Sequence, residues 1–552
     1  HLLLNTVCAQ VTAFSDPMMV PRDAPVTEGP DLFRWARAQG RQVSRSGEAP
    51  RPVRFDDHLP RAWLGEYLAW SFTRMAQGAP PTVRIEHIRA TAVSVLPRGD
   101  RAEVVLDDGT RLESDLAVVA TGHGLPADER PDGPRRPAYP LPDVLADVPA
   151  GATVAVLGTG LSAMDVVAAA TLGRGGRYTG EGAGRRYLPS GEEPRLVLAS
   201  RSGWWAAARP ALPPGRRPLP PVHLTRQALA AARARNPDGR LDVQADLWPL
   251  IRAEMRHRAG LTGVPADVAR LDPLLDGVSP WFEDAGQYRT SVLARSRADL
   301  VEAELGLGRS GVKEALEVLR DHRHVLRAVV EDDGLSEEGR RWFFGPFVAT
   351  VNRLAIGPQR ERIAELLLLE KAGMVTLAPG PNPLVERVGD RWRLSSTRLR
   401  RPAVQEADLL VDAHLHWPPP AERDQQLWRR LAAVARTRDG RVALDADGRP
   451  TALDGTPMRG VLVVGPPAEG SSYYNHYVPS PGATCQARAT IDRILAPLLG
   501  EVTRVPTGAP RRSSPPRGRR PPDRSEHPGP GADMNQTPTV ETSPRPFRAP
   551  RS

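Results

Sequence analysis

A glycine turn between two apolar segments is the part of the sequence best suited to chemistry. The stretch TVAVLGTGLSAMDVVAAATLG, residues 153–173, contains Gly158 and Gly160, followed by Ser162 and Ala163. In such a turn the first glycine makes a tight bend, the second lets the backbone approach a pyrophosphate, and the small third residue lets the helix pack on the strand. The phosphate would lie on the free N–H groups of the new helix. The spacing predicts a dinucleotide site, with a ligand-free strand–turn–helix as the alternative.

The elements that must position this turn are a buried strand before it and a helix after it. Residues 154–157 are apolar and partly β-branched, as in a buried parallel strand, and residues 161–172 are compatible with a helix. A membrane-spanning helix is the other candidate for an apolar stretch of about twenty residues. Asp165 and the three glycines argue against it, because they would be poorly placed in lipid. We therefore expect no contact with a membrane.

The end of the next strand predicts which nucleotide binds. Residues 195–200 form a second strand candidate, which ends in Ser200 and Arg201. Units selective for NAD place Asp or Glu there for the ribose 2'-hydroxyl, whereas a 2'-phosphate needs a cation. This favours NADPH over NADH, although residues 173–194 lengthen the usual spacing. The alternative for Arg201 is an ordinary solvated surface residue.

Composition and charge limit the classes to which the protein can belong. The chain has 552 residues, enough for two or more domains, and a net charge of +9. Residues 501–552 carry ten Arg and five acidic residues, so this tail supplies +5 of that charge. The tail is rich in Pro, Ser and Gly, which predicts disorder. Its one aromatic residue is Phe547, so we do not expect nucleic-acid binding.

Cysteine usage indicates a reducing compartment. Cys8 and Cys485 are the two cysteines, so no disulfide framework is expected and the cytoplasm is the predicted location. The first residue is His1 and not Met, and we expect further residues upstream. His322 and His324 have no further ligand at a convincing spacing, so no metal site is predicted.

The order of the elements predicts one domain inserted into another. A helix candidate at residues 60–75 precedes strand candidates at 101–106 and 115–121, with a turn, DDGT, between them. After the glycine turn the sequence becomes helical and then returns to strands, ending with GVLVVG at 460–465. Such an order arises when the two chain ends form an outer domain around a nucleotide domain.

Several segments together resemble one group of flavoproteins. VVATGHG at 118–124 resembles the segment in which the chain crosses between two nucleotide domains, and GVLVVGPPAEGSSYYNHYVPSPG at 460–482 resembles the strand and turn that close a flavin site. PRAWLGEYLAW at 60–70 is similar to a helix of flavin-dependent N-hydroxylases. HLLLNTVCAQVTAF at 1–14 resembles the segment after their first flavin-binding unit.

The group that these segments resemble most is the FAD-NAD(P)-binding family that contains L-aspartate N-monooxygenase (nitrosuccinate-forming) and an FAD-dependent urate hydroxylase. YLPSGEEP, SRSG and NRLAIGP add to the likeness, which extends over residues 1–498. The first nucleotide motif of the family is absent from this chain, so we expect Gly158 to carry the second site and the first to lie in a missing upstream segment.

The resemblance implies an α/β fold of the two-dinucleotide-binding, Rossmann-like flavoprotein type, with an inserted NAD(P) domain and a helical block. The implied limits are an FAD-binding domain at 1–135 and 401–500, an NADP-binding domain at 140–400 that includes the helical block 211–345, and a tail at 501–552.

The resemblance also implies FAD and NADPH as cofactors. The NADP site would comprise Gly158, Gly160, Ser162, Ala163, Ser200 and Arg201. The residues implied for FAD are Leu4, Asn5, Arg61, Tyr67, Thr121, Gly122, His123, Gly465, Pro466 and Gly470.

Five of the residues implied for FAD also have a structural alternative. Arg61 and Tyr67 could anchor a helix, Gly122 and Gly465 could serve as turns, and His123 could be a packing residue. Glu469 stands where many such flavoproteins have an Asp for the ribityl chain.

The implied activity is an NADPH-dependent flavin monooxygenase that acts on a small molecule with molecular oxygen, and N-hydroxylation of a small amino acid such as aspartate is the candidate reaction. The cofactors would carry the chemistry, while the protein orients them and excludes water. Asn352 and Arg353 are candidates for contacting substrate carboxylates, or they only order their loop. A flavin-dependent NAD(P)H oxidoreductase without oxygenation and a non-catalytic nucleotide-binding protein remain alternatives. The sequence indicates neither the substrate nor the oligomeric state.

Overall fold

The computed structural model describes most of the first 482 residues and one residue beyond them. The described residues are 1–16, 26–44, 49–123, 133–263, 280–331, 334–414, 426–475, 478–482 and 495. The basic tail at 501–552 lies outside them.

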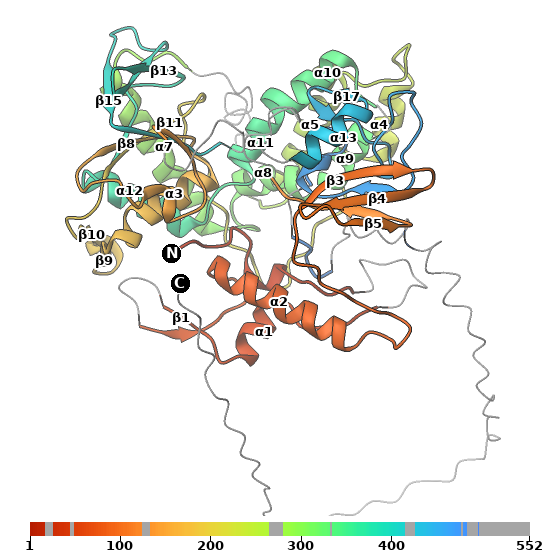
Figure 1. Ribbon diagram of the computed structural model, residues 1–552. Helices are drawn as coiled ribbons and strands as arrows, with labels where there is room; N and C mark the ends of the chain where they lie inside the picture. The colour runs from red at the N-terminus through yellow and green to blue at the C-terminus, as the bar shows by residue number, and fades with distance from the viewer. Residues whose placement is uncertain are drawn as a thin grey trace, which may run out of the picture. The chain divides into compact units, whose positions relative to one another are not determined.

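A five-stranded parallel sheet forms around the glycine turn (Figure 1). Its order is β12-β11-β8-β16-β7. The strands are β7 (Arg135–Pro137), β8 (Thr153–Leu157), β11 (Arg195–Ala199), β12 (Val375–Leu377) and β16 (Leu409–Asp412). This arrangement confirms the parallel sheet predicted around residues 154–157.

The two faces of the sheet are covered by different layers because successive strand residues point to opposite sides. Val154 and Val156 pack in the core formed with helices α3 (Leu161–Ala170), α7 (Ala285–Leu305) and α12 (Arg360–Lys371). Ala155 packs in a second core. That core includes residues of the antiparallel strands β13 (Pro383–Val388), β14 (Arg391–Ser396) and β15 (Val404–Ala407).

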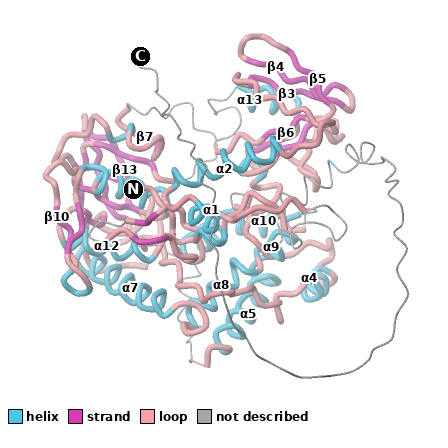
Figure 2. Tube along the Cα trace, turned by 90° about the horizontal axis from the view of Figure 1, so that it is seen from below, coloured by secondary structure: helices cyan, strands magenta, loops and turns pink. Residues whose placement is uncertain are grey.

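A second, smaller parallel pairing joins a segment before the Gly158 turn to a late segment of the described chain. Strand β6 (Ala117–Val119) pairs with β19 (Val461–Val463), with Val119 opposite Val463. Their core includes side chains of β3 (Ala92–Arg98), β4 (Arg101–Leu106) and helix α13 (Gln426–Val434). Strand β5 (Arg111–Ser114) pairs with β4 and completes an antiparallel sheet of three strands. Figure 2 shows β3, β4 and β5 beside α13. The hairpin β17 (Thr437–Arg438) and β18 (Arg441–Val442) follows α13.

The predicted helical block has its own core, which also takes in Tyr473 and Tyr474. Its helices are α4 (Arg226–Arg233), α5 (Trp248–Gly260), α8 (Gly311–Asp321), α9 (Arg323–Val330), α10 (Glu337–Trp342) and α11 (Val348–Leu354), with π-helical turns at Val243–Leu247 and Phe343–Phe347.

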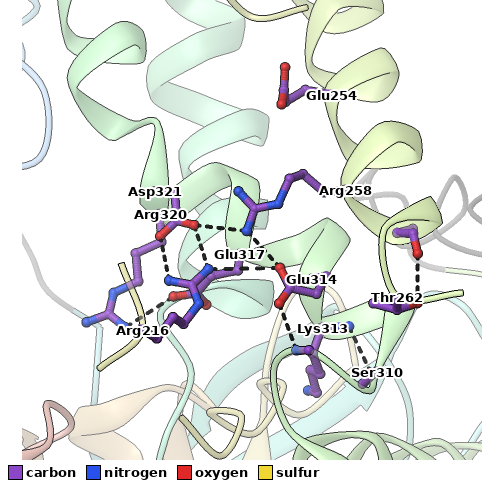
Figure 3. Close-up of polar contacts among 12 residues, drawn as sticks. Arg216, Glu254, Arg258, Thr262, Ser310, Lys313, Glu314, Glu317, Arg320 and Asp321 are labelled. Atoms are coloured by element: carbon purple, nitrogen blue, oxygen red, sulfur yellow. Dashed lines mark hydrogen bonds and ion pairs between the residues drawn. The ribbon is translucent and has the colours of Figure 1, made fainter. Parts of the chain in front are cut away.

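A buried ion network lies within this block (Figure 3). Arg258 Nη2 is 2.7 Å from Glu314 Oε2 and 3.3 Å from Asp321 Oδ2, and Arg216 Nη2 is 2.6 Å from the same Asp321 oxygen. Because these charged groups are almost fully enclosed, they need one another as partners.

The N-terminal segment packs around helices α1 (Leu32–Ala38) and α2 (Arg61–Gln77), with the short strands β1 (Gln42–Val43) and β2 (Arg51–Pro52) beside them. Helix α2 matches the prediction of a helix at residues 60–75. Among the described residues, none of the helices is long and apolar enough to cross a membrane.

One predicted connection is wrong. The turn at Asp107–Thr110 joins β4 to β5, a strand that the sequence interpretation missed, and does not lead directly into the strand at 115–121. That later strand, β6, pairs with β19 from the other end of the chain. A distant partner of this kind leaves no signal in the local pattern.

Candidate functional site

The Gly158 turn has the geometry predicted for a dinucleotide site. Gly158 has φ +123°, and its N–H donates a 2.7 Å hydrogen bond to the carbonyl of Ala199. A Cβ at this position would lie 3.2 Å from the carbonyl oxygen of Ala413. Both the backbone conformation and the close approach therefore require glycine.

Gly160 leaves room for a ligand at the start of helix α3. It is the N-cap residue of α3, no side chain caps the helix there, and a Cβ on Gly160 would meet no atom within 4 Å. The first N–H groups of a helix need partners from outside it, and phosphate oxygens suit them. Ser162 and Ala163 follow in the first turn, both buried. These features fit a bound pyrophosphate.

The turn lies where the strand order changes direction. From β8 the sheet extends to β11 and β12 on one side and to β16 and β7 on the other. In sheets of this type ligands bind beyond the carboxyl ends of the strands at such a switch point. Gly158, after β8, lies against Ala413, after β16, at this point, and His414 is the next residue along the chain.

An Asp–His pair at this switch point was missed by the sequence interpretation. Asp412 is 2% exposed, and its Oδ1 lies 2.8 Å from His414 Nδ1, while its other oxygen pairs with Arg135. Asp412 is the last residue of the apolar strand LLVD, and an acidic residue at a strand end was the feature of the sequence that could have indicated this pair. Recognising it required the knowledge that this strand lies next to β8.

Ser200 and Arg201, the residues predicted to favour NADPH over NADH, lie at the end of β11, next to the glycine turn. Ser200 Oγ accepts a 3.1 Å hydrogen bond from the Gly203 N–H, so this hydroxyl shapes the turn that carries Arg201. The Arg201 residue is exposed. The insertion at 173–194 forms the hairpin of β9 (Arg177–Thr179) and β10 (Arg186–Leu188). It lies between the end of α3 and the start of β11, at the amino ends of the strands, so it does not displace the residues at their carboxyl ends.

A second set of predicted residues gathers at the carboxyl ends of β6 and β19. Thr121, Gly122 and His123 follow β6, and Gly465 and Pro466 follow β19, whose Val464 N–H donates to Val119. Gly122 has φ +69° with no atom within 4 Å of a built Cβ, and Gly465 has φ +76° with its nearest neighbour at 4.0 Å. Thr121 Oγ1 accepts a 3.1 Å hydrogen bond from Trp428. Two open glycine turns at one edge of a parallel pairing fit the approach of FAD.

A cavity of about 290 Å³ opens beside Gly465. Its wall contains Val463, Val464, Ala468, Ser471, Ser472 and Asn475, and on the charged side Glu331, Arg340, Arg438 and Asp445. Arg340 is held by Asp439 Oδ2 at 3.0 Å and by the carbonyl of Gly470.

Gly470 and Glu469 belong to the tightly held loop after this cavity. Gly470 has φ +104°, and a Cβ there would meet Arg441 Nη1 at 2.8 Å. The Glu469 carboxylate accepts hydrogen bonds from the backbone of Tyr474 and from both the backbone and side chain of Asn475. Tyr474 has φ +63°, an uncommon conformation for a residue with a side chain. Glu469 thus holds this loop.

The remaining residues implied for FAD lie in the N-terminal segment. The carbonyl of Leu4 accepts a 2.6 Å hydrogen bond from Gln359 Nε2, which ties residues 1–5 to the segment before α12. Asn5 is half-buried in the same segment. Arg61 donates to the Leu3 carbonyl at 3.2 Å and to Tyr139 Oη at 3.1 Å.

Tyr67 is fully buried, and its hydroxyl is used by the protein itself. It donates to the Pro30 carbonyl at 2.7 Å and accepts from the Ala13 N–H at 3.0 Å. Burial raises the pKa of Tyr67, so it stays a neutral phenol. Its contacts anchor helix α2 to two loops.

Asn352 and Arg353 are neighbours on α11 and differ in exposure. Asn352 is exposed, whereas Arg353 is half-buried and its carbonyl accepts a 2.8 Å hydrogen bond from the Ala207 N–H. Burial lowers the pKa of Arg353 to about 10, so it remains a cation at neutral pH.

Comparisons with known proteins agree with this geometry. A family described as FAD-NAD(P)-binding matches residues 1–124, which include seven of the residues implied for FAD. The L-aspartate N-monooxygenase (nitrosuccinate-forming) of Streptomyces davaonensis is 31% identical over 516 residues, with 80% of this chain and 78% of the relative covered. The chain belongs to this FAD-NAD(P)-binding family.

Other relatives include the nitrosuccinic acid synthase of Aspergillus oryzae, 30% identical over 491 residues, with 79% of this chain and 73% of the relative covered. Among solved structures, the ornithine N-hydroxylase of Kutzneria sp. is 14% identical with a TM-score of 0.41, and covers 85% of this chain and 83% of its own.

Membership of the FAD-NAD(P)-binding family confirms several predictions. The chain is an α/β flavoprotein of the two-dinucleotide-binding type, and FAD and a nicotinamide dinucleotide are its cofactors. It is an oxidoreductase of the monooxygenase kind, which uses molecular oxygen and a small-molecule substrate. The two alternatives, an NAD(P)H oxidoreductase that does not oxygenate a substrate and a non-catalytic nucleotide-binding protein, are therefore not favoured.

Proposed function

We propose that the chain is an NADPH-dependent flavin monooxygenase that N-hydroxylates L-aspartate. The observation that carries this proposal is the 31% identity over 516 residues to an L-aspartate N-monooxygenase, with 80% of this chain covered. When bound, FAD and NADPH would supply hydride transfer and the activation of oxygen.

The work of this chain's own residues is to bind and orient these molecules. The N–H groups at Gly160 and Ser162 would hold the pyrophosphate of NADPH, and Arg201 would contact its 2'-phosphate. Gly122 and Gly465, with the cavity between Gly465 and Arg340, would accommodate FAD. Support for these assignments is the open space at the glycines and the position of each turn at the carboxyl edge of a parallel pairing.

An aspartate substrate needs cations for its two carboxylates. Arg353 is suited to one of them because a guanidinium binds a carboxylate through two parallel hydrogen bonds. Its neighbour Asn352 is exposed on the same helix and could add an amide donor. We therefore propose that Asn352 and Arg353 contact the carboxylates of the substrate.

The domain division is also proposed. Support for an outer FAD-binding domain, residues 1–135 and 401–500, is the pairing of β6 with β19. Support for an inserted domain at 140–400, with its helical block at 211–345, is the sheet around β8. Because β7 and β16 belong to that sheet, we place residues 135–137 and 409–412 with the inserted domain.

A cytoplasmic location belongs to the same proposal. The buried Cys8 is a free thiol, and burial raises its pKa to about 12, which keeps it protonated and unreactive. Fractionation of the producing cells, followed by immunodetection, tests this location.

The proposed activity is tested first by spectroscopy of the purified protein. We expect a flavin absorbance that bleaches with NADPH and returns in air, and oxygen uptake that rises with L-aspartate. L-asparagine, which lacks one carboxylate, is the matched control. Oxygen uptake that is the same with and without L-aspartate would contradict the substrate assignment, and no flavin spectrum in the presence of added FAD would contradict the activity.

A further inference from the structure

Helix α9 of the helical block binds the loop that follows β19. Arg327, in the last turn of this helix, donates from Nε to the Tyr473 carbonyl at 3.0 Å and from Nη2 to the Tyr474 carbonyl at 3.2 Å. Arg327 is 4% exposed, and both tyrosines are buried. Carbonyls that are buried outside helices and strands need donors of this kind. One guanidinium therefore satisfies two consecutive peptide groups of the loop.

Tyr474 has a conformation that its surroundings must maintain. Its φ is +63°, and the other described residues besides glycine with a positive φ are Asn382 and Asp439. Asn and Asp adopt this conformation readily, whereas an aromatic residue adopts it at a cost in free energy. Residues strained in this way persist only where several contacts fix them, and they occur mostly at ligand sites and switch regions.

The contacts of Tyr474 fix both its backbone and its ring. Its N–H donates to Glu469 Oε1 at 3.2 Å, and its carbonyl accepts from Arg327. Its ring packs in the core of the helical block, with the Arg323 guanidinium 5.9 Å from the ring centre. Because Glu469 belongs to the same loop, the contact with Arg327 is the one that ties the strained backbone to α9.

This tie joins two walls of the cavity beside Gly465. The loop contributes Ala468, Ser471, Ser472 and Asn475 to the wall, and the helical block contributes Val330, Glu331 and Arg340. Asn475 directly follows Tyr474, and Val330 and Glu331 directly follow the turn of α9 that carries Arg327. Arg327 therefore fixes the two walls relative to each other.

Arg340 makes a second tie between the same parts, but it has another role as well. It donates to the Gly470 carbonyl and to Asp439 Oδ2, and it also lines the cavity. A change at Arg340 would thus alter both the loop and the cavity surface. Among the described residues that form the cavity wall, Arg327 is absent. Its influence on a ligand in the cavity has to pass through the loop.

We propose that Arg327 is a positioning residue of the flavin site, which holds the loop at 469–475 against α9 and so keeps the cavity beside Gly465 in the shape that binds FAD. This inference rests on the proposal that FAD occupies this cavity. The loop is ordered before FAD binds, so the cost of ordering it does not reduce the affinity. The helical block thus contributes to flavin binding through a residue that does not touch the flavin.

The test is titration of the purified full chain with FAD, followed by flavin fluorescence, and with NADP⁺, followed by calorimetry. In Arg327→Gln the two carbonyls lose a charged donor and the binding-competent loop becomes a minor state, so we expect the Kd for FAD to rise about 10- to 100-fold. The Kd for NADP⁺ should change by less than about twofold, because the Gly158 turn belongs to another sheet.

Steady-state kinetics separates positioning from direct contact. At saturating FAD the kcat for NADPH oxidation in Arg327→Gln should return to within about twofold of the wild-type value, because bound FAD itself selects the ordered loop. Arg327→Lys keeps the charge but lacks the planar fork that reaches both carbonyls, and we expect a smaller rise in the Kd for FAD, about three- to tenfold. If Arg327→Gln does not fold, Arg327→Lys carries the test.

Two variants serve as controls. Glu254→Gln weakens the same helical block at residues 222–224, and Arg341→Gln changes an exposed arginine of α10. Both should bind FAD with wild-type affinity.

The outcomes are distinguishable. An unchanged FAD affinity in the Arg327 variants, with wild-type binding intact, would overturn this assignment and leave the proposed function standing. An equal rise in Glu254→Gln would show that loss of stability is the cause, and would also overturn it. If the wild-type chain itself does not bind FAD, the proposed activity and this assignment both fail.

Discussion

Arg61 Nη2 lies 2.7 Å from Asp165 Oδ2, and this ion pair joins helix α2 to helix α3, the helix that begins at the glycine turn. Tyr139 also donates to Asp165. Burial raises the pKa of Asp165 although the charge of Arg61 lowers it. The ion pair therefore links the N-terminal segment implied for FAD to the helix that follows the Gly158 turn. The charge of Arg61 favours the ionised form of the buried Asp165 carboxylate.

Removing that cation should destabilise the protein in a pH-dependent way. Arg61→Met leaves Asp165 buried without its ion-pair partner, and we expect the free energy of unfolding to fall by about 2 kcal/mol at pH 8. Because the folded pKa of Asp165 is raised, its stabilising contribution is greatest at low pH and is lost as the pH rises through that pKa. The loss in the variant should thus be smaller at pH 5.5 than at pH 8.

Urea unfolding at the two pH values measures this difference. Arg74→Met, an exposed arginine in the last turn of the same helix, is the control. Equal losses at both pH values would show that Asp165 is not the group responsible.

The two glycines of the turn should respond differently to a methyl group. Gly158→Ala forces a side chain into φ +123° and to 3.2 Å from the Ala413 carbonyl, so we expect a loss of about 1–3 kcal/mol in unfolding free energy together with weaker NADP⁺ binding. Gly160→Ala meets no protein atom within 4 Å. Its methyl occupies the space through which the pyrophosphate approaches, so NADP⁺ binding should weaken at least tenfold with little change in stability.

Thermal unfolding and NADP⁺ titration of both variants separate the two roles. If Gly160→Ala bound NADP⁺ as tightly as the wild type, the turn would not be the pyrophosphate site.

Arg201 should determine the choice between the two nicotinamide dinucleotides. In Arg201→Gln we expect the KM for NADPH to rise about tenfold or more, since a charge-assisted contact to the 2'-phosphate is lost, while the KM for NADH stays the same. Arg195→Gln, at the other end of β11, is the control. Steady-state kinetics with each dinucleotide measures the two KM values. Equal rises in the KM for NADPH and for NADH would show that Arg201 does not contact the 2'-phosphate.

The helical block should lose stability when one buried carboxylate is neutralised. Glu254 is fully buried and accepts hydrogen bonds from the N–H groups of residues 222–224, the shortest 2.6 Å, from His223. Burial alone would raise its pKa, but these hydrogen bonds lower it overall. Glu254→Gln weakens all three, and we expect a loss of about 2 kcal/mol at pH 7.

The pH dependence of this effect has the opposite sign to that of Asp165. Because the folded pKa of Glu254 is lowered, its contribution is present above the ordinary glutamate pKa and is lost as the pH falls through the folded value. The difference between wild type and Glu254→Gln should shrink below about pH 4.5. Glu338→Gln, an exposed residue of the same block, is the control, and a constant difference across this range would contradict the assignment.

Local chemistry explains which parts of the fold could be predicted. Gly158 and Gly160 were found because a strand, a glycine turn and a helix follow one another in the sequence, and the structure has all three at almost the predicted limits. Asp412 and His414 were missed because their importance depends on the adjacency of β16 and β8, which are about 250 residues apart.

Burial was the other property that the sequence did not reveal. Arg295 looks like one of many arginines in the sequence, and only the structure shows that its guanidinium lies 4.5 Å from the centre of the Trp204 ring. Tyr67, by contrast, was implied for FAD, and the structure shows its hydroxyl engaged with the backbone of Pro30 and Ala13. A residue type does not say whether its side chain faces a ligand or the core.

The most direct test of the central claim is mass spectrometry of the products formed from L-aspartate under ¹⁸O₂, with NADPH and added FAD. We predict N-oxygenated aspartate products that carry ¹⁸O, formed in proportion to the NADPH consumed. Oxidation of NADPH with hydrogen peroxide as the product and L-aspartate recovered unlabelled would contradict the claim and identify an NADPH oxidase instead.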